Sequence, residues 1–276
     1  MPSRILDFRG QPALHLAMPE GDAITVALHG AHLLSWTTAD GRERIYLSPD
    51  AVFDGRAAIR GGVPICCPQF NQRGTLPKHG FMRNLTWNLA GHDASSVSFA
   101  LDDNEATRAL WPHAFAARLE LQLAPGSLRI ALALTNAGDA PWSFAAALHS
   151  YLYVDDIGAA RLEGLQGAAR WDALRDERQI EASAALQFHG EFDSVYRAPP
   201  QPLRLVQPSG ALEISQSDSC TETVVWNPGA ALAARLADMP DDGFRHMLCV
   251  EAARIDEPVT LAPGASWQGW QQLTVI

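Results

Sequence analysis

The chain has 276 residues, and 21 Lys and Arg stand against 31 Asp and Glu, so the formal net charge is −10. Hydrophobic residues make up 47% and charged residues 19%, which is enough apolar material for a sizeable core and excludes a disordered chain. The acidic balance argues against nucleic-acid binding, and neither a signal peptide at residues 1–7 nor a membrane-length apolar run occurs, so we expect a cytoplasmic protein.

Short runs of alternating apolar and polar residues, separated by Gly, Pro, Asn or Asp, dominate the chain and predict strands. The clearest are 117–123 and 128–136, which are joined by Pro125-Gly126-Ser127 and therefore predict a hairpin. Further strands are expected at 23–28, 96–101, 203–207, 212–216, 223–226, 247–252 and 270–276.

Helical signals are few. A short helix is expected over 103–111, ended by Pro112, and another over the Ala/Leu-rich stretch 229–239, ended by Pro240. Closely spaced strands with rare helices predict an all-β sandwich or barrel and no βαβ units. Because no linker or fixed-period repeat divides the chain, we expect residues 1–276 to form a single domain, and we expect a monomer.

Several kinds of chemistry lack their motif. There is no Gly-rich dinucleotide or phosphate loop, no H-E-x-x-H and no G-x-S-x-G. The histidines lack zinc-type spacing, and no C-x-x-C occurs among Cys66, Cys67, Cys220 and Cys249, which predicts buried free thiols and no metal. Acid–base chemistry by side chains, without a cofactor, remains.

One basic segment interrupts the acidic chain. Residues 55–92 contain no Asp or Glu but five cations, Arg56, Arg60, Arg73, Lys78 and Arg83. Such a segment, rich in Gly and Pro turns, favours an anion site, because Arg holds a phosphate with two donors. The alternative is a solvated basic face whose charges pair with acids elsewhere.

Three further positions are candidates for chemistry. His149 lies in the apolar run 145–152, where a hydrogen-bonded core histidine is the simpler interpretation. Glu251 follows an apolar run, and a buried carboxylate costs several kcal/mol unless it is paired or protonated, although strand alternation could also direct it to solvent. Asp193 is a weaker candidate, since acids near turns are common.

Five motifs in chain order resemble those of the aldose 1-epimerase (mutarotase) superfamily, and more narrowly its hexose-6-phosphate mutarotase (glucose-6-phosphate 1-epimerase) branch. They are Arg60-Gly61-Gly62-Val63-Pro64-Ile65-Cys66, Leu76-Pro77-Lys78-His79-Gly80-Phe81-Met82-Arg83-Asn84, Leu148-His149-Ser150-Tyr151, Trp226-Asn227-Pro228 and Cys249-Val250-Glu251. The resemblance extends from about residue 10 to the C-terminus. It implies a large antiparallel galactose mutarotase-like β-sandwich, with a sugar cleft on one concave sheet.

Carried over by position, the resemblance makes His149 and Glu251 the catalytic pair. It makes Arg60, Lys78, Arg83 and Asp193 contacts to the substrate, and it places His79 in the cleft. Two departures bear on substrate preference. The loop 67–74 is shorter than in many relatives, and Lys78 stands where many carry Gln.

The implied reaction interconverts the α and β anomers of a sugar phosphate. A base removes the C1 hydroxyl proton and an acid protonates the ring oxygen, which suits Glu251 as base and a charged His149 as acid. The basic segment would hold the 6-phosphate. The aromatic candidates to stack on the sugar are Trp36, Phe70, Phe81 and Trp226, although most tryptophans of such a sandwich should be core.

Three alternatives stay open. One is an aldose 1-epimerase acting on a sugar without phosphate, and another is a carbohydrate-binding β-sandwich without turnover. Retention of both His149 and Glu251 argues against the second, since a binding protein needs no matched acid and base. A glycosidase is disfavoured because its usual pair is two carboxylates, for which only Asp193 and Glu251 could be nominated.

Overall fold

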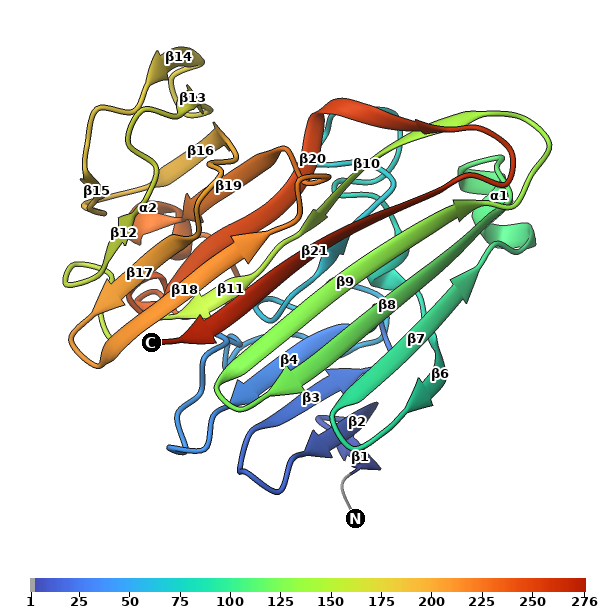
Figure 1. The fold of residues 1–276 in the computed structure, drawn as a ribbon, viewed down its shortest axis with the longest axis horizontal. Coiled ribbons are helices and arrows are strands. Elements are labelled where there is room, and N and C mark those ends of the chain that lie inside the picture. Colours follow the sequence, from blue (N-terminus) through green and yellow to red (C-terminus); the bar gives the residue numbers. More distant parts are fainter. Residues whose placement is uncertain (1–2) are drawn as a thin grey trace.

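A computed structural model describes residues 3–276 and shows three antiparallel sheets (Figure 1). The smallest has four strands in chain order. They are β1 (Ser3–Phe8), β2 (Gln11–Ala17), β3 (Ala23–Ala27) and β4 (His32–Thr37).

The largest sheet has nine strands, of which β9 and β8 form its longest hairpin. Their order is β15 (Ala185–Leu186), β12 (Arg161–Glu163), β17 (Leu203–Gln207), β18 (Gly210–Gln216), β21 (Ser266–Val275), β9 (Ser127–Asn136), β8 (Phe115–Ala124), β7 (Ser96–Asp102) and β6 (Asn88–His92). Ala124 pairs with Ser127, so Pro125-Gly126 forms the turn, with Gly126 at a φ of +65°. The predicted hairpin is confirmed.

The third sheet, of eight strands, carries the site. Its order is β14 (Glu177–Ile180), β13 (Ala169–Asp172), β16 (Phe192–Arg197), β19 (Glu222–Asn227), β20 (Met247–Leu261), β10 (Trp142–Leu148) and β5 (Ile65–Cys66), with β11 (Tyr151–Tyr153) also paired to β20.

Strand alternation divides the side chains of this sheet between two buried environments. Leu248 and Val250 of β20 join a hydrophobic cluster that also contains residues of the nine-stranded and four-stranded sheets. Cys249 and Glu251 point to the other face, since successive side chains of a strand alternate. The packing of sheet on sheet confirms the predicted all-β sandwich.

Loops cover that other face. Phe70 packs against Val195 and Val224, and Met239 packs in a separate cluster with Cys249. Residues 247–253 of β20 are consequently all buried, whichever way they point. The loops turn this face of the sheet into the floor of a cleft.

Helices are short, as predicted. They are α1 (Glu105–Leu110), α2 (Gly229–Ala233), and two 3-10 turns, η1 (Met82–Asn84) and η2 (Gly243–His246). The helix expected over 229–239 stops at Ala233 and continues as turns, which lets Leu236 and Met239 pack beside the cleft floor. Within residues 3–276, no helix is long and apolar enough to cross a membrane.

The cysteines follow the prediction. All four are free and buried.

Candidate active site

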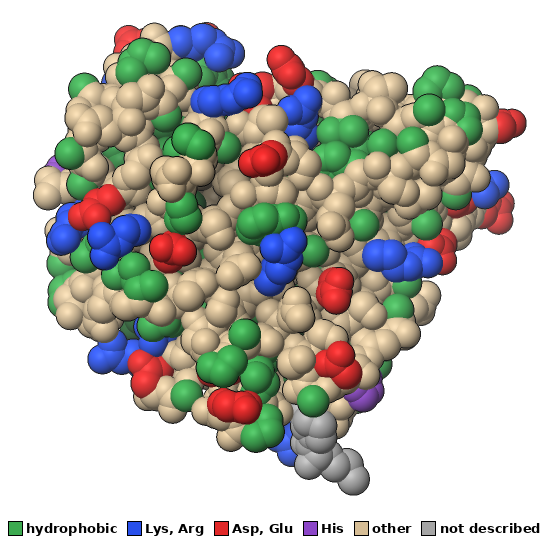
Figure 2. Space-filling view, in the orientation of Figure 1, with side chains coloured by type: hydrophobic (Ala, Val, Ile, Leu, Met, Phe, Trp, Pro, Cys, Tyr) green, Lys and Arg blue, Asp and Glu red, His purple; other side chains and the backbone are tan. Residues whose placement is uncertain are grey.

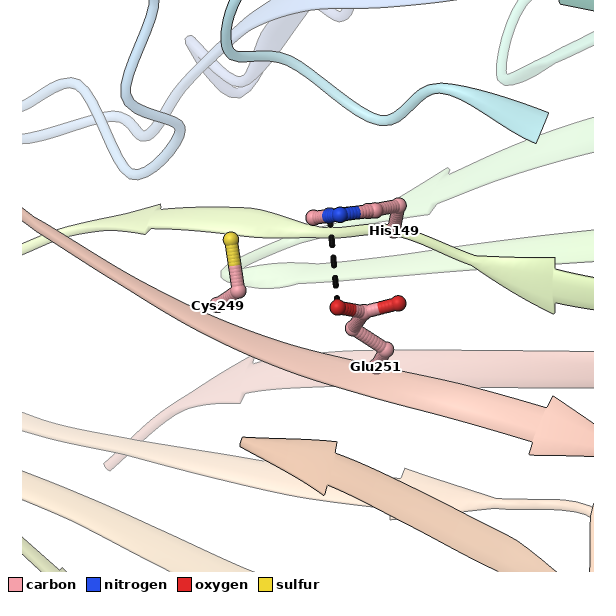
Figure 3. Close-up of side chains that lie close together, drawn as sticks. All are labelled: His149, Cys249 and Glu251. Atoms are coloured by element: carbon pink, nitrogen blue, oxygen red, sulfur yellow. Dashed lines mark ion pairs between the residues drawn. The ribbon is translucent and has the colours of Figure 1, made fainter. Parts of the chain in front are cut away.

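His149 and Glu251 meet across a break between two strands. β10 ends at Leu148, which pairs with Ala252, and β11 begins at Tyr151, which pairs with Cys249. His149 therefore lies opposite Glu251, with Nδ1 3.4 Å from Oε1 (Figure 3). The run 145–152, read as one strand from the sequence, is interrupted at His149-Ser150, and this irregular backbone presents the imidazole beside the carboxyl group.

Packing fixes the imidazole ring. The backbone amide of His149 donates to the carbonyl of Pro64 (3.0 Å). The ring stacks on Tyr151 with centroids 4.9 Å apart and 10° between planes, while His79 and Trp226 meet it edge to face. Aromatic contacts on several sides leave the ring little rotational freedom.

Burial controls the protonation of this pair. Glu251 is 1% exposed and His149 9% exposed. Burial raises the pKa of Glu251 well above its usual value, with nearby Asp193 adding to the effect. Burial lowers the pKa of His149 well below its usual value, and the positive charges of Arg83 and Arg60 lower it further.

Burial thus favours the neutral form of both groups, which differs from the expected charged imidazolium. In that form the pair holds one transferable proton on the carboxyl group. Moving that proton to the imidazole gives an ion pair of the same net charge. Either form offers one basic atom and one acidic atom, which is the combination that concerted proton transfer requires.

The pair lines a cleft of about 410 Å³. Side chains reach it from the loops before η1, from β16 and β19, and from the segment after α2. All seven residues predicted for the site line it: Arg60, Lys78, His79, Arg83, His149, Asp193 and Glu251. The volume of the cleft and the mixed polarity of its lining suit a small polar ligand.

Arg60 is held by two partners. Its Nε lies 3.1 Å from Asp238 Oδ1, and its Nη1 donates to the hydroxyl of Tyr151 (3.1 Å), so its pKa is raised although burial opposes this. The adjacent loop presses on β4: a Cβ on Gly62, at a φ of +67°, would lie 2.2 Å from the carbonyl oxygen of Leu33. Only glycine allows this approach.

Lys78, His79 and Arg83 come from one loop. Arg83 Nη2 donates to the carbonyl of Lys78 (2.9 Å), and the amide of Asn71 donates to His79 Nδ1 (3.3 Å). Burial, with the charges of Arg83 and Lys78, lowers the pKa of His79 to about 3, so its ring is neutral. Among the described residues, neither Lys78 nor Arg83 forms an ion pair, which leaves both charges for a ligand.

The basic segment does not act as one unit. Arg73 pairs with Asp256 (2.8 Å) and lies over the ring of Trp171, and Arg56 is exposed outside the cleft. Of these cations, Arg60, Lys78 and Arg83 line the cleft, while pairing with distant acids describes Arg73 and, through Asp238, also Arg60. Counting charges along the chain gives no information on which side chains share a cavity.

The aromatic candidates divide in the same way. Phe70 and Trp226 line the cleft, whereas Trp36 and Phe81 are 0% and 3% exposed in the main core. The prediction was wrong for these two, because their strands and loops direct them between the sheets.

On the acidic side of the cleft, burial raises the pKa of Asp193 to about 6, and neighbouring Glu191 adds to this. Asp193 pairs in register with Trp226, and Trp226 with Cys249, which sets all three side chains on the cleft face.

Sequence reasoning missed three polar lining residues, Asn71, Tyr151 and Glu191. Tyr151 could have been found, since it lies two positions from His149 in an alternating run. The loop residues carry no periodic signal.

The structure also brings together three possible metal-ligand atoms that sequence spacing did not reveal. A nitrogen of His149, the sulfur of Cys249 and a carboxylate oxygen of Glu251 all lie within 4.8 Å of one another, among buried side chains (Figure 3). The sequence predicted no metal site, because spacing along the chain does not reveal donors that adjacent strands bring together.

Comparison with solved structures gives the class of protein first. A crystal structure from Salmonella typhimurium, titled "a putative mutarotase", superimposes with a TM-score of 0.90 at 29% identity and covers 99% of this chain and 93% of the other. The large sandwich that buries His149 and Glu251 is therefore a mutarotase fold.

Sequence comparison gives the family. The family model described as aldose 1-epimerase matches residues 12–274, so the chain belongs to the aldose 1-epimerase family. Two relatives carry the name "Putative glucose-6-phosphate 1-epimerase". The one from Cenchrus ciliaris is 34% identical over 91% of this chain and 80% of its own length, and the one from Escherichia coli (strain K12) is 36% identical over 84% and 79%.

Proposed function

We propose that the protein is an isomerase that interconverts the α and β anomers of a hexose 6-phosphate, as a glucose-6-phosphate 1-epimerase. The observation that carries this proposal is the His149–Glu251 pair, 3.4 Å apart, in a cleft that also contains Arg60, Lys78 and Arg83. Membership of the aldose 1-epimerase family and the names of the relatives support it.

The pair can open the sugar ring without a covalent intermediate. Transfer of the Glu251 proton to His149 Nδ1 gives a carboxylate and an imidazolium. The carboxylate removes the C1 hydroxyl proton while imidazolium Nε2 protonates the ring oxygen, and the C1–O5 bond breaks to leave an aldehyde. Each such positioned proton transfer contributes about 10²- to 10⁴-fold in rate.

Ring closure reverses these transfers on the opposite face of the carbonyl. After rotation about C1–C2, the O5 hydroxyl returns its proton to Nε2 as it attacks C1. The carboxyl group of Glu251 then returns its proton to O1. Return of the Nδ1 proton to the Glu251 carboxylate then restores the starting protonation state, and the product is the other anomer.

In this proposal, Lys78 and Arg83 are the main contacts to the phosphate. Arg60 already has Asp238 and the Tyr151 hydroxyl as partners, whereas the other two cations form no ion pair among the described residues. A phosphate that gains a charge-assisted hydrogen bond from Arg83 is stabilised by about 1.5–3 kcal/mol. Asp193 and His79 complete the polar lining, for the sugar hydroxyls.

The test is magnetisation exchange between the anomeric protons, measured by NMR with a catalytic amount of protein. We expect exchange above the spontaneous rate with glucose 6-phosphate, and slower exchange at the same concentration of glucose. Equal exchange with both sugars would favour an aldose 1-epimerase for unphosphorylated sugar. Spontaneous rates with both would leave a carbohydrate-binding sandwich and refute the proposal.

We further propose that residues 1–276 act as a single domain. One hydrophobic cluster contains side chains from all three sheets, which supports this proposal. The expected monomer stays a prediction.

A further inference from the structure

Three side chains beside the cleft floor offer three different donor atoms to one point. They are a ring nitrogen of His149, Cys249 Sγ and a carboxylate oxygen of Glu251, and no two of the three atoms are more than 4.8 Å apart (Figure 3). Cys249 and Glu251 are two residues apart on β20 and therefore share a face of the strand, and the break after β10 places His149 beside them.

These donors are not used up by other contacts. His149 Nδ1 and Glu251 Oε2, which is the carboxylate oxygen other than the one 3.4 Å from Nδ1, are buried and have no hydrogen-bond partner, and Glu251 is 1% exposed. Buried polar atoms are normally hydrogen-bonded, so two unpartnered atoms in one cluster call for a ligand or for chemistry. Proton transfer accounts for the imidazole and the carboxyl group but gives no role to the thiol of Cys249.

The distances suit a small tetrahedral cation. Zinc bonds of roughly 2.0–2.3 Å at tetrahedral angles separate their donor atoms by about 3.5 Å. His149 Nδ1 and Glu251 Oε1 are already 3.4 Å apart, and the thiol, within 4.8 Å of the other donors, has to approach them by about 1 Å on binding. Imidazole, thiolate and carboxylate together are a zinc-type donor set.

The charges also balance. Binding releases the thiol proton of Cys249 and the carboxyl proton of Glu251 to solvent. The resulting thiolate and carboxylate neutralise a divalent cation, so the occupied site adds no net charge facing Arg60 and Arg83 across the cleft. A sulfur ligand favours soft or borderline ions over Mg²⁺ or Ca²⁺, which prefer oxygen.

We propose that His149, Cys249 and Glu251 form a binding site for Zn²⁺ or a similar thiophilic divalent cation. The cation leaves its fourth coordination position open toward the cleft. Because it takes the nitrogen and the carboxylate oxygen between which the proton moves, its binding inhibits catalysis. This inhibition rests on the proposed mutarotase function, whereas the binding itself does not.

Cobalt titration tests the binding without an activity assay. Apo protein should bind one Co²⁺ per chain, with visible bands of a tetrahedral ion and a near-ultraviolet thiolate-to-cobalt absorption, and Zn²⁺ should abolish both. Cys249→Ser should remove the thiolate absorption and weaken binding by more than about 10-fold, the smallest loss typical of outer-shell partners. Cys220→Ser, which alters another buried thiol outside the cluster, is the matched control.

Each outcome decides one proposal. Absence of the thiolate absorption in the wild-type protein, or its survival in Cys249→Ser, would overturn the metal site, and the wild-type spectrum decides even if the variant misfolds. A cobalt spectrum in a protein that does not exchange anomers would support the site and refute the mutarotase. Zn²⁺ should suppress wild-type exchange, and exchange that persists with the site loaded would overturn the inhibition.

Discussion

The two large sheets differ in how far their side chains are exposed to solvent. On β8 of the nine-stranded sheet, buried residues alternate with partly or fully exposed ones, and isolated charges of both signs are scattered over the side of the molecule seen in Figure 2. On β20 of the eight-stranded sheet, residues 247–253 are all buried. The first sheet has one covered face, whereas loops and the core cover both faces of the second.

Because of this difference in burial, the residues that determine stability and the residues that determine chemistry should lie in different parts of the molecule. A polar side chain on an open face keeps its water, so its pKa and its substitution matter little. On the covered face, burial is the main cause that raises the pKa of Glu251 and lowers the pKa of His149. Substitutions should therefore affect turnover on the cleft face of the eight-stranded sheet, and folding alone in the layer between the sheets.

Glu251→Gln should give the largest effect. Anomer exchange should fall by about 10²- to 10⁴-fold, because the amide keeps the volume of the side chain but cannot shuttle the proton. Urea unfolding should show no large loss of stability, since burial already favours the neutral form of the carboxyl group. His149→Asn should behave in the same way. Retention of more than about a tenth of the activity would remove that residue from the acid–base role.

Leu132→Ala tests the opposite side of the comparison. Leu132 of β9 is 1% exposed between the sheets, and its truncation should lower the free energy of unfolding by about 2–5 kcal/mol. At temperatures where the variant stays folded, kcat and KM should match the wild type. A change in KM would show that the core and the cleft are coupled, and the comparison would fail.

Arg83→Ala should raise KM for the phosphosugar about 10- to 150-fold, which corresponds to about 1.5–3 kcal/mol for a charge-assisted hydrogen bond. Exchange of free glucose should hardly change. Arg56→Ala is the matched control, because Arg56 belongs to the same basic segment but lies exposed outside the cleft. Equal losses with both sugars would argue against a phosphate contact at Arg83.

Asp193→Asn should give the smallest effect, on the pH dependence of stability. The pKa of Asp193 is raised to about 6, so between its unfolded value and pH 6 the folded state binds the extra proton. Its contribution is present below the unfolded pKa and is lost as the pH rises through about 6. The variant should therefore lose less stability than the wild type from pH 4 to 7 in denaturant titrations. Parallel curves would refute the raised pKa.

The sequence predicted well whatever depends on chain neighbours. Alternation over 117–123 and 128–136 specified the hairpin of β8 and β9, because a period of two and a Pro-Gly turn are local properties. The ordered motifs indicated the family, and the seven residues carried over by position all line the cleft.

Tertiary structure alone decided what depends on residues far apart in the chain. The alternation of apolar and polar residues could not show that β10 ends before His149. The charge count could not show that Arg73 lies outside the cleft and pairs with Asp256. The opposite pKa shifts of His149 and Glu251 come mainly from desolvation by loops and strands distant in sequence, and the strand arrangement brings Cys249 close to both. Desolvation is a property of a packed volume, and a linear pattern carries no measure of it.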